Sequence, residues 1–481
     1  MRDAMISFRD PGGALCAIDG RIVRIVAAGA PDLEIFLSSK AAQKYVNSGQ
    51  VVRTTILSGS QGVDVLAHPE IGRTYTDLNG RMLVEHERIP FPSYPYEWTP
   101  EMLHAAGLLT LDLAQSLRGE GLGLKDATPL NILFRGTEPV FVDLLSFEQR
   151  DMRDATWLPY AQFVRTFLLP LMAYKYFGLS LDHTLTMRRD GVEPEELYRF
   201  LGTFQRFMPP FLSLVSIPTW LGSRHAEDDT TIYKKKSVAD PEKAGFILDS
   251  LLNRLRRTLR RLTPPAGRKS AWSAYMAAGG NNYAAEQFAA KESFVANVLR
   301  EFAPKQILDV GCNTGHFSFM AARAGANVVA IDYDPVVAGQ VWRDARAERL
   351  DVLPLVVNLA RPSPGVGWRN EECPAFLDRA RGRFDAVFML AVVHHMLVSE
   401  RVPLTRILEL AAELTRDLLI IEFIEPQDSM FRRLTRGRDE LHKDLNVTLF
   451  ETVCRQHFDI LRSESIPGGA RFLYLLRKKS S

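Results

Sequence analysis

Two acidic residues and a glycine-rich turn form the strongest chemical pattern in the chain. The segment Ile307–Gly315 reads ILDVGCNTG, in which an apolar run containing Asp309 leads directly into a turn with Gly311 and Gly315. Such a turn at the end of a parallel strand is expected to bring backbone N–H groups up to a ligand. Asp332, 23 residues after Asp309, ends the next apolar run. An acid there can accept both hydroxyls of an adenosine ribose, and Asp309 can hold an amine or a hydroxyl.

The spacing argues against two other nucleotide-binding loops. A P-loop needs Lys followed by Ser or Thr after its last glycine, but His316 and Phe317 stand there. The dinucleotide fingerprint has a glycine where this chain has Asn313. An NAD-type Rossmann domain without methyl chemistry is the alternative that the turn alone leaves open.

Three segments in order, ILDVGCNTGHFS, VVAIDYDP and FDAVFMLAVVHH, resemble those of the class I S-adenosylmethionine (SAM) methyltransferases. The resemblance covers about Trp272 to Lys478 and implies a Rossmann-like sheet, with an antiparallel hairpin closing it around Phe458–Arg462 and Arg471–Leu476. It implies SAM as cofactor. By position, the residues around SAM would be Asp309, Gly311, Asn313, Gly315, Asp332, Tyr333 and Asn358.

Two strand ends carry the finer expectations. Asp332 would accept from the ribose, with Tyr333 or Asp334 near the adenine. Asn358 follows the third strand, Val352–Val357, where its amide oxygen could accept from the adenine amino group. An ordinary turn residue at the end of a strand is the alternative for Asn358.

Adjacent histidines follow the fourth strand, Asp385–Leu390, where the resemblance places the methyl group. His395 and His394 are the candidate catalytic residues, as general base or substrate contact, because imidazole titrates near neutral pH. His395 is the preferred one, since one of the pair could instead pack under the sheet. A metal site is disfavoured because no further ligand stands at metal-like spacing.

Charged and aromatic residues flank this region. Glu422, in the fifth strand Leu418–Phe423, and Glu425 beyond it either line an acceptor pocket or are ordinary charges at a strand end. Trp272, Tyr275, Tyr283 and Lys291 precede the first strand, where such a leader often folds over the cofactor as a lid. Aromatic packing on the sheet is the alternative.

A second constellation lies in the N-terminal half. Asp126 and Asn131 are five residues apart, and Asp143 follows the strand Val140–Val142. This pattern resembles the catalytic and metal loops of the protein-kinase and aminoglycoside-phosphotransferase superfamily. By position, Asp126 would act on the acceptor hydroxyl, while Asn131 and Asp143 would hold Mg²⁺ for ATP.

Several features depart from that superfamily. Leu124 replaces the usual His two residues before the first Asp, and Leu144 and Leu145 replace the Phe-Gly of the second motif. The first hairpin lacks a glycine-rich loop, and Arg24 is the cation nearest to the expected strand Lys. A degenerate kinase-like domain is therefore predicted. An active kinase and a coincidental pattern in an unrelated fold are the alternatives.

Strand and helix patterns divide the chain. Gly13–Ile18 and Arg21–Val26 read as strands joined at Asp19-Gly20, Asp32–Val46 as a helix, and Thr99–Arg118 as a helix that starts with a cap and a proline. The predicted domains are 1–98, a β-rich kinase-like N-lobe; 99–223, a helical C-lobe; 224–270, a basic helix and linker; and 271–481, the methyltransferase domain.

Composition narrows the class of protein. The chain has 481 residues, 46% of them hydrophobic, and a net charge of +2, which favours two or three globular domains and no global attraction to nucleic acid. The four cysteines form no CxxC pair. No signal peptide or membrane-spanning run is apparent, so a cytoplasmic location is predicted. The basic amphipathic helix Leu251–Leu262 is expected to bury its leucines between domains, and membrane-surface contact is the alternative.

The resulting prediction is a multidomain α/β and α+β protein. It is expected to be a SAM-dependent methyltransferase acting on an oxygen of a saccharide or small molecule. The pairing of domains is similar to that of rhizobial host-specific nodulation methyltransferase-type proteins. The alternatives are a bifunctional kinase–methyltransferase modifying one acceptor and a non-enzymatic ligand-binding regulator.

Overall fold

The computed structural model describes residues 5–7, 12–26, 30–58, 60–66, 68, 81–222, 237–270, 272 and 285–480. Tyr275 and Tyr283, expected in the leader, lie outside these residues. The chain forms two compact units, each described here by itself. Unit 1 consists of Met1–Tyr96, Met102–Pro264 and Val366–Cys373, and unit 2 of Glu97–Glu101, Pro265–Gly365 and Pro374–Ser481.

Unit 1 contains a five-stranded antiparallel sheet in the order β1-β2-β3-β5-β4. The predicted hairpin is confirmed: Ile18 pairs with Arg21, and both turn residues, Asp19 and Gly20, have positive φ angles of 48° and 81°. A two-residue turn of this kind matches the twist of the strands it joins. The strands are β1 Met5–Ser7, β2 Gly13–Ile18, β3 Arg21–Val26, β4 Thr54–Leu57 and β5 Met82–His86.

The first predicted helix of unit 1 is in fact two helices. Ser39 has φ −70° and ψ 150°, so it breaks the predicted helix Asp32–Val46 into α1, Ala30–Ser38, and α2, Lys40–Asn47. Its hydroxyl accepts a hydrogen bond from the Ala42 N–H and caps α2.

Helices form most of the rest of unit 1. The predicted helix before Arg118 is confirmed as α5, Pro100–Arg118, and α11, Pro241–Arg261, buries Leu252, Leu255 and Leu259. Ion pairs from Arg256 to Asp112 and from Arg118 to Asp249 fix α11 against α5. The other elements of the unit are α3 Ser60–Leu66, β6 Leu122–Leu124, β7 Ile132–Arg135, β8 Glu138–Phe141, β9 Phe147–Gln149, α6 Tyr160–Phe163, α7 Leu169–Phe177, α8 Leu181–Leu185, α9 Pro194–Tyr198 and α10 Ile217–Gly222.

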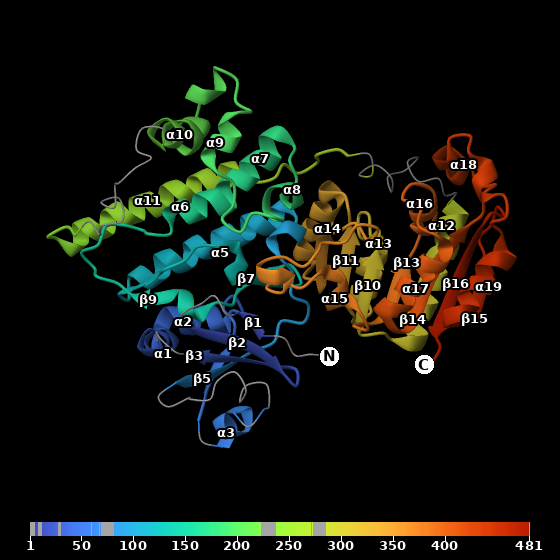
Figure 1. Cartoon of the computed structure of the whole chain (residues 1–481), viewed down its shortest axis with the longest axis horizontal. Coiled ribbons are helices and arrows are strands. Elements are labelled where there is room, and N and C mark those ends of the chain that lie inside the picture. The colour runs from blue at the N-terminus through green and yellow to red at the C-terminus, as the bar shows by residue number, and fades with distance from the viewer. Residues whose placement is uncertain are drawn as a thin grey trace. The chain divides into compact units, whose positions relative to one another are not determined.

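Unit 2 is built on a seven-stranded sheet in the order β12-β11-β10-β13-β14-β16-β15 (Figure 1). The first five strands in this order are parallel, and β16 runs antiparallel between β14 and β15. The predicted Rossmann-like sheet and its closing hairpin are thereby confirmed. The strands are β10 Gln306–Val310, β11 Asn327–Asp332, β12 Val352–Val356, β13 Phe384–Met389, β14 Thr415–Ile424, β15 Phe458–Ser465 and β16 Arg471–Lys478.

Helices cover this sheet and leave one edge for ligands. Side chains from α12, α13 and α14 share one core cluster with alternate residues of the strands, such as Val328, Ala330 and Phe388. The strand order reverses at β10 and β13, the switch point where α/β sheets bind ligands at their carboxyl ends. The helices are α12 Ala285–Phe302, α13 His316–Arg323, α14 Pro335–Glu348, α15 Phe376–Ala380, α16 Val393–Val398, α17 Leu404–Leu414, α18 Ser429–Thr435 and α19 Val447–His457.

None of the helices in the described parts of the chain is long and apolar enough to cross a membrane.

Candidate cofactor site

The turn after β10 has a shape that requires its two glycines. Gly311 and Gly315 have φ angles of 71° and 85°, in the left-handed region that other residues resist. A Cβ atom on Gly315 would lie 2.9 Å from the Phe319 ring and 3.0 Å from Val341, and one on Gly311 would lie 3.3 Å from Val392. The turn therefore packs tightly against α13, α14 and the end of β13.

Every backbone N–H of this turn is used within the protein. The expectation that they would point at a ligand is therefore wrong. A site whose N–H groups are already bonded cannot cradle phosphate oxygens. The bonds run from Gly311 and Cys312 to the Ile331 carbonyl oxygen (2.9 and 3.1 Å), from Asn313 to Asp332 Oδ2 (3.0 Å), from Thr314 to Asn313 Oδ1 (2.8 Å) and from Gly315 to the Cys312 carbonyl oxygen (2.9 Å).

Asp332 is the acceptor group at the end of β11. Its two oxygens accept from the Asp334 and Asn313 N–H groups, each at 3.0 Å, and the side chain is nearly buried. A carboxylate offers about four acceptor positions, so two bonds leave capacity for the hydroxyls of a ribose. Burial raises the pKa of Asp332 to about 6.

Asp309 lies deeper, below the turn. Its Oδ2 accepts a 2.5 Å hydrogen bond from the Ser318 hydroxyl of α13, and burial raises the pKa of this carboxyl to about 6. Ser318 was not singled out in the sequence, where a polar residue within the apolar run of a helix was its only signal. Asp309 thus ties β10 to α13 under the turn.

Trp272 links the ends of three strands. Its ring packs edge-on against Tyr333 and His395, with centroid distances of 6.3 and 5.2 Å. Its carbonyl oxygen accepts from Asn313 Nδ2 at 3.3 Å. The residue that was expected to form a lid or to pack on the sheet therefore contacts the site residues that follow β10, β11 and β13.

Asn358, after β12, is engaged in a local turn. Its Oδ1, which was expected to accept from adenine, accepts from the Ala360 N–H at 2.9 Å. This is the bond of a turn at the end of a strand, and the oxygen retains one more acceptor position.

The two histidines at the start of α16 have different surroundings. His394 is buried, its Nδ1 has no hydrogen-bond partner among the described residues, and burial lowers its pKa well below the usual value. His395 is half-buried against Trp272, and burial lowers its pKa to about 4. Both imidazoles are therefore neutral at pH 7. Within the described residues no group of three His, Cys, Asp or Glu could hold a metal ion.

A buried ionic network lies in the same unit. Lys291 Nζ of α12 is 2.7 Å from Glu422 Oε2 of β14, and Arg471 contacts both Glu422 (3.8 Å) and Asp428 (2.8 Å). Glu422 has no exposed surface. It therefore supports the sheet from within and does not line an open acceptor pocket, and Lys291 is its buried partner.

In unit 1 the structure brings together two of the three residues, Asp126, Asn131 and Asp143, whose spacing was compared with that of kinases. Asn131 Nδ2 donates to Ser146 Oγ at 2.9 Å, and that hydroxyl donates to Asp143 at 2.7 Å. Arg24 of β3 forms a 2.5 Å ion pair with the same Asp143. Burial opposes the charge of Asp143, but Arg24 and Ser146 outweigh it and lower its pKa.

Asp126 lies outside that network. Its contact is a 3.4 Å hydrogen bond from Gln162 Nε2.

Comparison with known proteins identifies the domain in unit 2. Residues 283–466 match the family model described as a methyltransferase domain. The nodulation protein NoeA of Rhizobium meliloti is 29% identical over 475 residues, which are 98% of this chain and 95% of that protein. The tRNA U34 carboxymethyltransferase of Alcanivorax borkumensis is 32% identical over 145 residues, 28% of this chain and 40% of that protein.

Two solved structures show weaker likenesses. The N-methyltransferase NodS from Bradyrhizobium japonicum is 13% identical with a TM-score of 0.31, covering 40% of this chain and 97% of that chain. The bifunctional kinase-methyltransferase WbdD is 17% identical with a TM-score of 0.30, covering 44% of each chain. At these scores neither likeness supports an argument.

The sheet order, the glycine turn and the matched domain together define a class I methyltransferase domain. The protein is a SAM-dependent methyltransferase, and its cofactor is S-adenosylmethionine.

Proposed function

We propose that unit 2 binds SAM over the turn after β10 and transfers its methyl group to an oxygen of a saccharide or another small molecule. The observation that supports this binding mode is that the turn offers hydrogen-bond acceptors but no unused N–H donors. Its N–H groups are consumed internally, while Asp332 and Asp309 offer buried carboxylates. This balance suits a ligand with an amine, a sulfonium and ribose hydroxyls, and disfavours one with phosphates.

The residues proposed to contact SAM lie at or just after the carboxyl ends of the parallel strands. Asp332 is assigned to the ribose hydroxyls, with Tyr333 beside the adenine. Gly311, Asn313 and Gly315 are assigned to the methionine part, because they form the turn whose shape depends on the positive φ angles of its two glycines. Asp309 is proposed to act from below through the field of its carboxylate, and Asn358 to contact the adenine edge through its remaining acceptor position.

The chemistry requires little beyond positioning. SAM supplies a methyl group that is already activated, so the protein must align the acceptor and exclude water. His395 is proposed as the general base: a neutral imidazole half-buried at the end of β13 can accept the proton of an acceptor hydroxyl. His394, buried behind it with its ring 4.2 Å away, is proposed to position His395.

Titration calorimetry with SAM and the variants Asp332→Ala and Gly311→Arg tests the site. We expect each variant to weaken SAM binding by at least tenfold, because one removes the ribose acceptor and the other forces a long side chain against Val392 at a positive φ angle and so displaces the turn. Asp378→Asn, an exposed carboxyl on α15, is the matched control and should bind SAM like the wild type. Unchanged affinity in both site variants would show that SAM binds elsewhere.

We further propose that unit 1 is a degenerate kinase-like domain. The supporting observation is that Arg24 holds the carboxylate of Asp143, the group that would have to bind Mg²⁺. The test is Mg²⁺-dependent ATP hydrolysis by the full chain. Turnover that disappears in Asp143→Ala would instead favour a bifunctional kinase–methyltransferase.

A further inference from the structure

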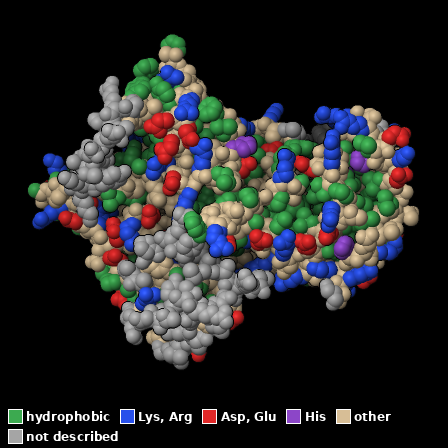
Figure 2. Space-filling view, in the orientation of Figure 1, with side chains coloured by type: hydrophobic (Ala, Val, Ile, Leu, Met, Phe, Trp, Pro, Cys, Tyr) green, Lys and Arg blue, Asp and Glu red, His purple; other side chains and the backbone are tan. Residues whose placement is uncertain are grey.

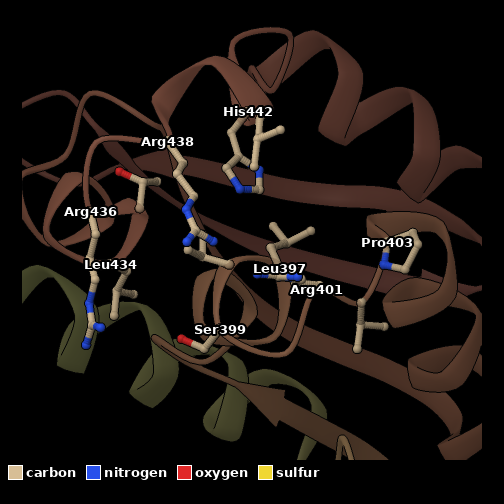
Figure 3. A pocket seen from close by; sticks show the side chains of 12 residues that line it. Leu397, Ser399, Arg401, Pro403, Leu434, Arg436, Arg438 and His442 are labelled. Carbon is tan, nitrogen blue, oxygen red and sulfur yellow. The ribbon is translucent and has the colours of Figure 1, made fainter.

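A basic pocket lies in unit 2 beyond the cofactor site. It has a volume of about 600 Å³ and is formed by the end of α16, the loop before α17, the end of α18 and the short helix Asp439–His442 (Figure 3). Ser399 and Arg401 come from the segment between α16 and α17 (Figure 3). Arg436, Arg438 and His442 come from the segment that follows α18 (Figure 3). The pocket is therefore built from segments that follow β13 and β14, the two strands on the far side of the switch point.

The pocket carries positive charge that the described residues do not neutralise. Arg401, Arg436 and Arg438 form no ion pair with an acidic side chain in the described parts of the chain, and all three are exposed. Figure 2 shows Lys and Arg side chains gathered over α16 and α18. Gathering like charges without partners costs electrostatic free energy, which an anion bound among them would offset.

The pocket is close to the proposed methyl-transfer point. α16 begins beside His395, and its C-terminal end forms the pocket wall; the Ser399 N–H donates to the His395 carbonyl oxygen at 2.9 Å. One helical turn, about 5.4 Å along the axis, separates the two. An acceptor of the size of one sugar could place a hydroxyl at His395 and another of its groups in the pocket.

We propose that this pocket binds an anionic group of the methyl acceptor, which makes the acceptor an acidic saccharide or small molecule. This inference rests on the proposed function and narrows its substrate class. Guanidinium groups bind phosphate, sulfate or carboxylate through paired N–H donors, and three arginines line this pocket. Leu397 and Leu441 supply apolar wall for the body of the acceptor.

Anion binding is tested on the full chain by titration with inorganic phosphate at low salt. We expect the double variant Arg436→Gln/Arg438→Gln to lower phosphate affinity by at least tenfold. Arg432→Gln/Arg433→Gln removes two neighbouring exposed arginines of α18 that do not line the pocket, and should bind phosphate like the wild type. No phosphate binding to the wild type, or equal losses in both double variants, would overturn the pocket.

A second experiment distinguishes an anionic group on the methyl acceptor from a free anion such as phosphate. Transfer of labelled methyl from SAM is measured into a cell extract that is then split on an anion-exchange column. Label in the retained fraction, with a KM for that fraction raised at least tenfold in Arg436→Gln/Arg438→Gln, supports the proposal. Label only in the unretained fraction overturns it.

SAM affinity is measured on the same samples and distinguishes the two proposals. Intact SAM binding without phosphate binding refutes the pocket alone. If the wild-type protein does not bind SAM, the proposed function is refuted, whether or not the protein binds phosphate.

Discussion

Asp332 and Asp309 are carboxyl groups whose ionisation is opposed by burial, with the pKa of each raised to about 6. At neutral pH both are mostly charged, and in mild acid both become neutral. Asp332 also faces Asp334 and the Asn313 N–H, while Asp309 faces Ser318 and the charge of Lys291. A ligand that donates to these groups and carries positive charge binds best to their ionised forms.

The affinity for SAM should therefore fall below about pH 6. In the folded protein each carboxyl takes up a proton as pH drops through 6, and ligand binding must then release it. The dissociation constant should rise by up to about tenfold per pH unit for each carboxyl involved. Calorimetry between pH 5 and 8 measures this, and Asp332→Asn should bind more weakly with a shallower slope. A constant affinity across this range would rule out ionised carboxylates as the SAM acceptors.

His395 gives a prediction about rate. Because burial lowers its pKa to about 4, the imidazole stays neutral from pH 8 down to about pH 5, and the rate should depend little on its ionisation there. His395→Ala should lower kcat by about 10²–10⁴-fold, the usual contribution of a general base, while SAM affinity changes less than twofold. Single-turnover transfer of labelled methyl checks both, with His457→Ala of α19 as control. A loss confined to SAM affinity would make His395 a binding residue.

The spacing of a few residues was enough to place the turn and the ends of its neighbouring strands. Gly311, Gly315 and Asp332 lie where the pattern requires them, because strand ends in a parallel sheet meet at one edge. The internal use of the turn N–H groups could not be predicted, since it depends on the orientation of the Asp332 and Asn313 side chains. The burial of Glu422 also depends on a partner, Lys291, 131 residues away.

At the scale of elements, that ion pair joins α12 to β14. Removing one member of a buried pair costs about 3–5 kcal/mol where it leaves the other charge uncompensated. Arg471 stays 3.8 Å from Glu422 in Lys291→Met, so this variant should destabilise unit 2 by less than that amount, measured by urea unfolding followed through the far-UV signal.

The double variant Lys291→Met/Glu422→Leu is the informative comparison. It removes both charges and leaves the 2.8 Å ion pair between Arg471 and Asp428 in place. We expect it to be more stable than Lys291→Met. If the single variant were as stable as the wild type, the pair would contribute nothing to joining the two elements.

The break between α1 and α2 is a second element-scale feature. Ser39 interrupts a helical pattern that the sequence suggested was continuous, because a serine that caps a new helix is also tolerated inside one. Ser39→Ala should cost about 1 kcal/mol by leaving the Ala42 N–H without its cap. Ser38→Ala, one residue earlier and exposed, is the matched control, and an equal cost in both variants would contradict the cap.

At the scale of the whole molecule, unit 2 is not one continuous stretch of the chain. The short segment Glu97–Glu101 belongs to it, and Glu97 and Glu101 pair with Arg379 and Arg343. No local pattern could have revealed this membership, because each pair spans more than 240 residues. By contrast, the Rossmann-like sheet and its closing hairpin were predictable, because three segments in order resemble those of the class I methyltransferases.

This arrangement predicts a long-range effect. Glu97→Gln should remove the ion pair between residue 97 and the nearly buried Arg379 of α15 and raise hydrogen exchange in Phe376–Ala380. Hydrogen–deuterium exchange with mass spectrometry measures this. Glu242→Gln, an exposed residue of α11, is the control. Unchanged exchange in α15 would mean that the segment does not stabilise it.

All backbone N–H groups of the turn after β10 are bonded within the protein. This bonding affects which adenosine compounds can bind there. ATP and NAD share the adenosine of SAM but carry phosphates, and here they would meet two buried carboxylates and no unbonded turn N–H group. The feature that we propose to lie beside the sulfonium would therefore repel phosphate-bearing competitors. Discrimination of this kind would need no additional residues, because it would follow from the negative charge of the two carboxylates beside the turn.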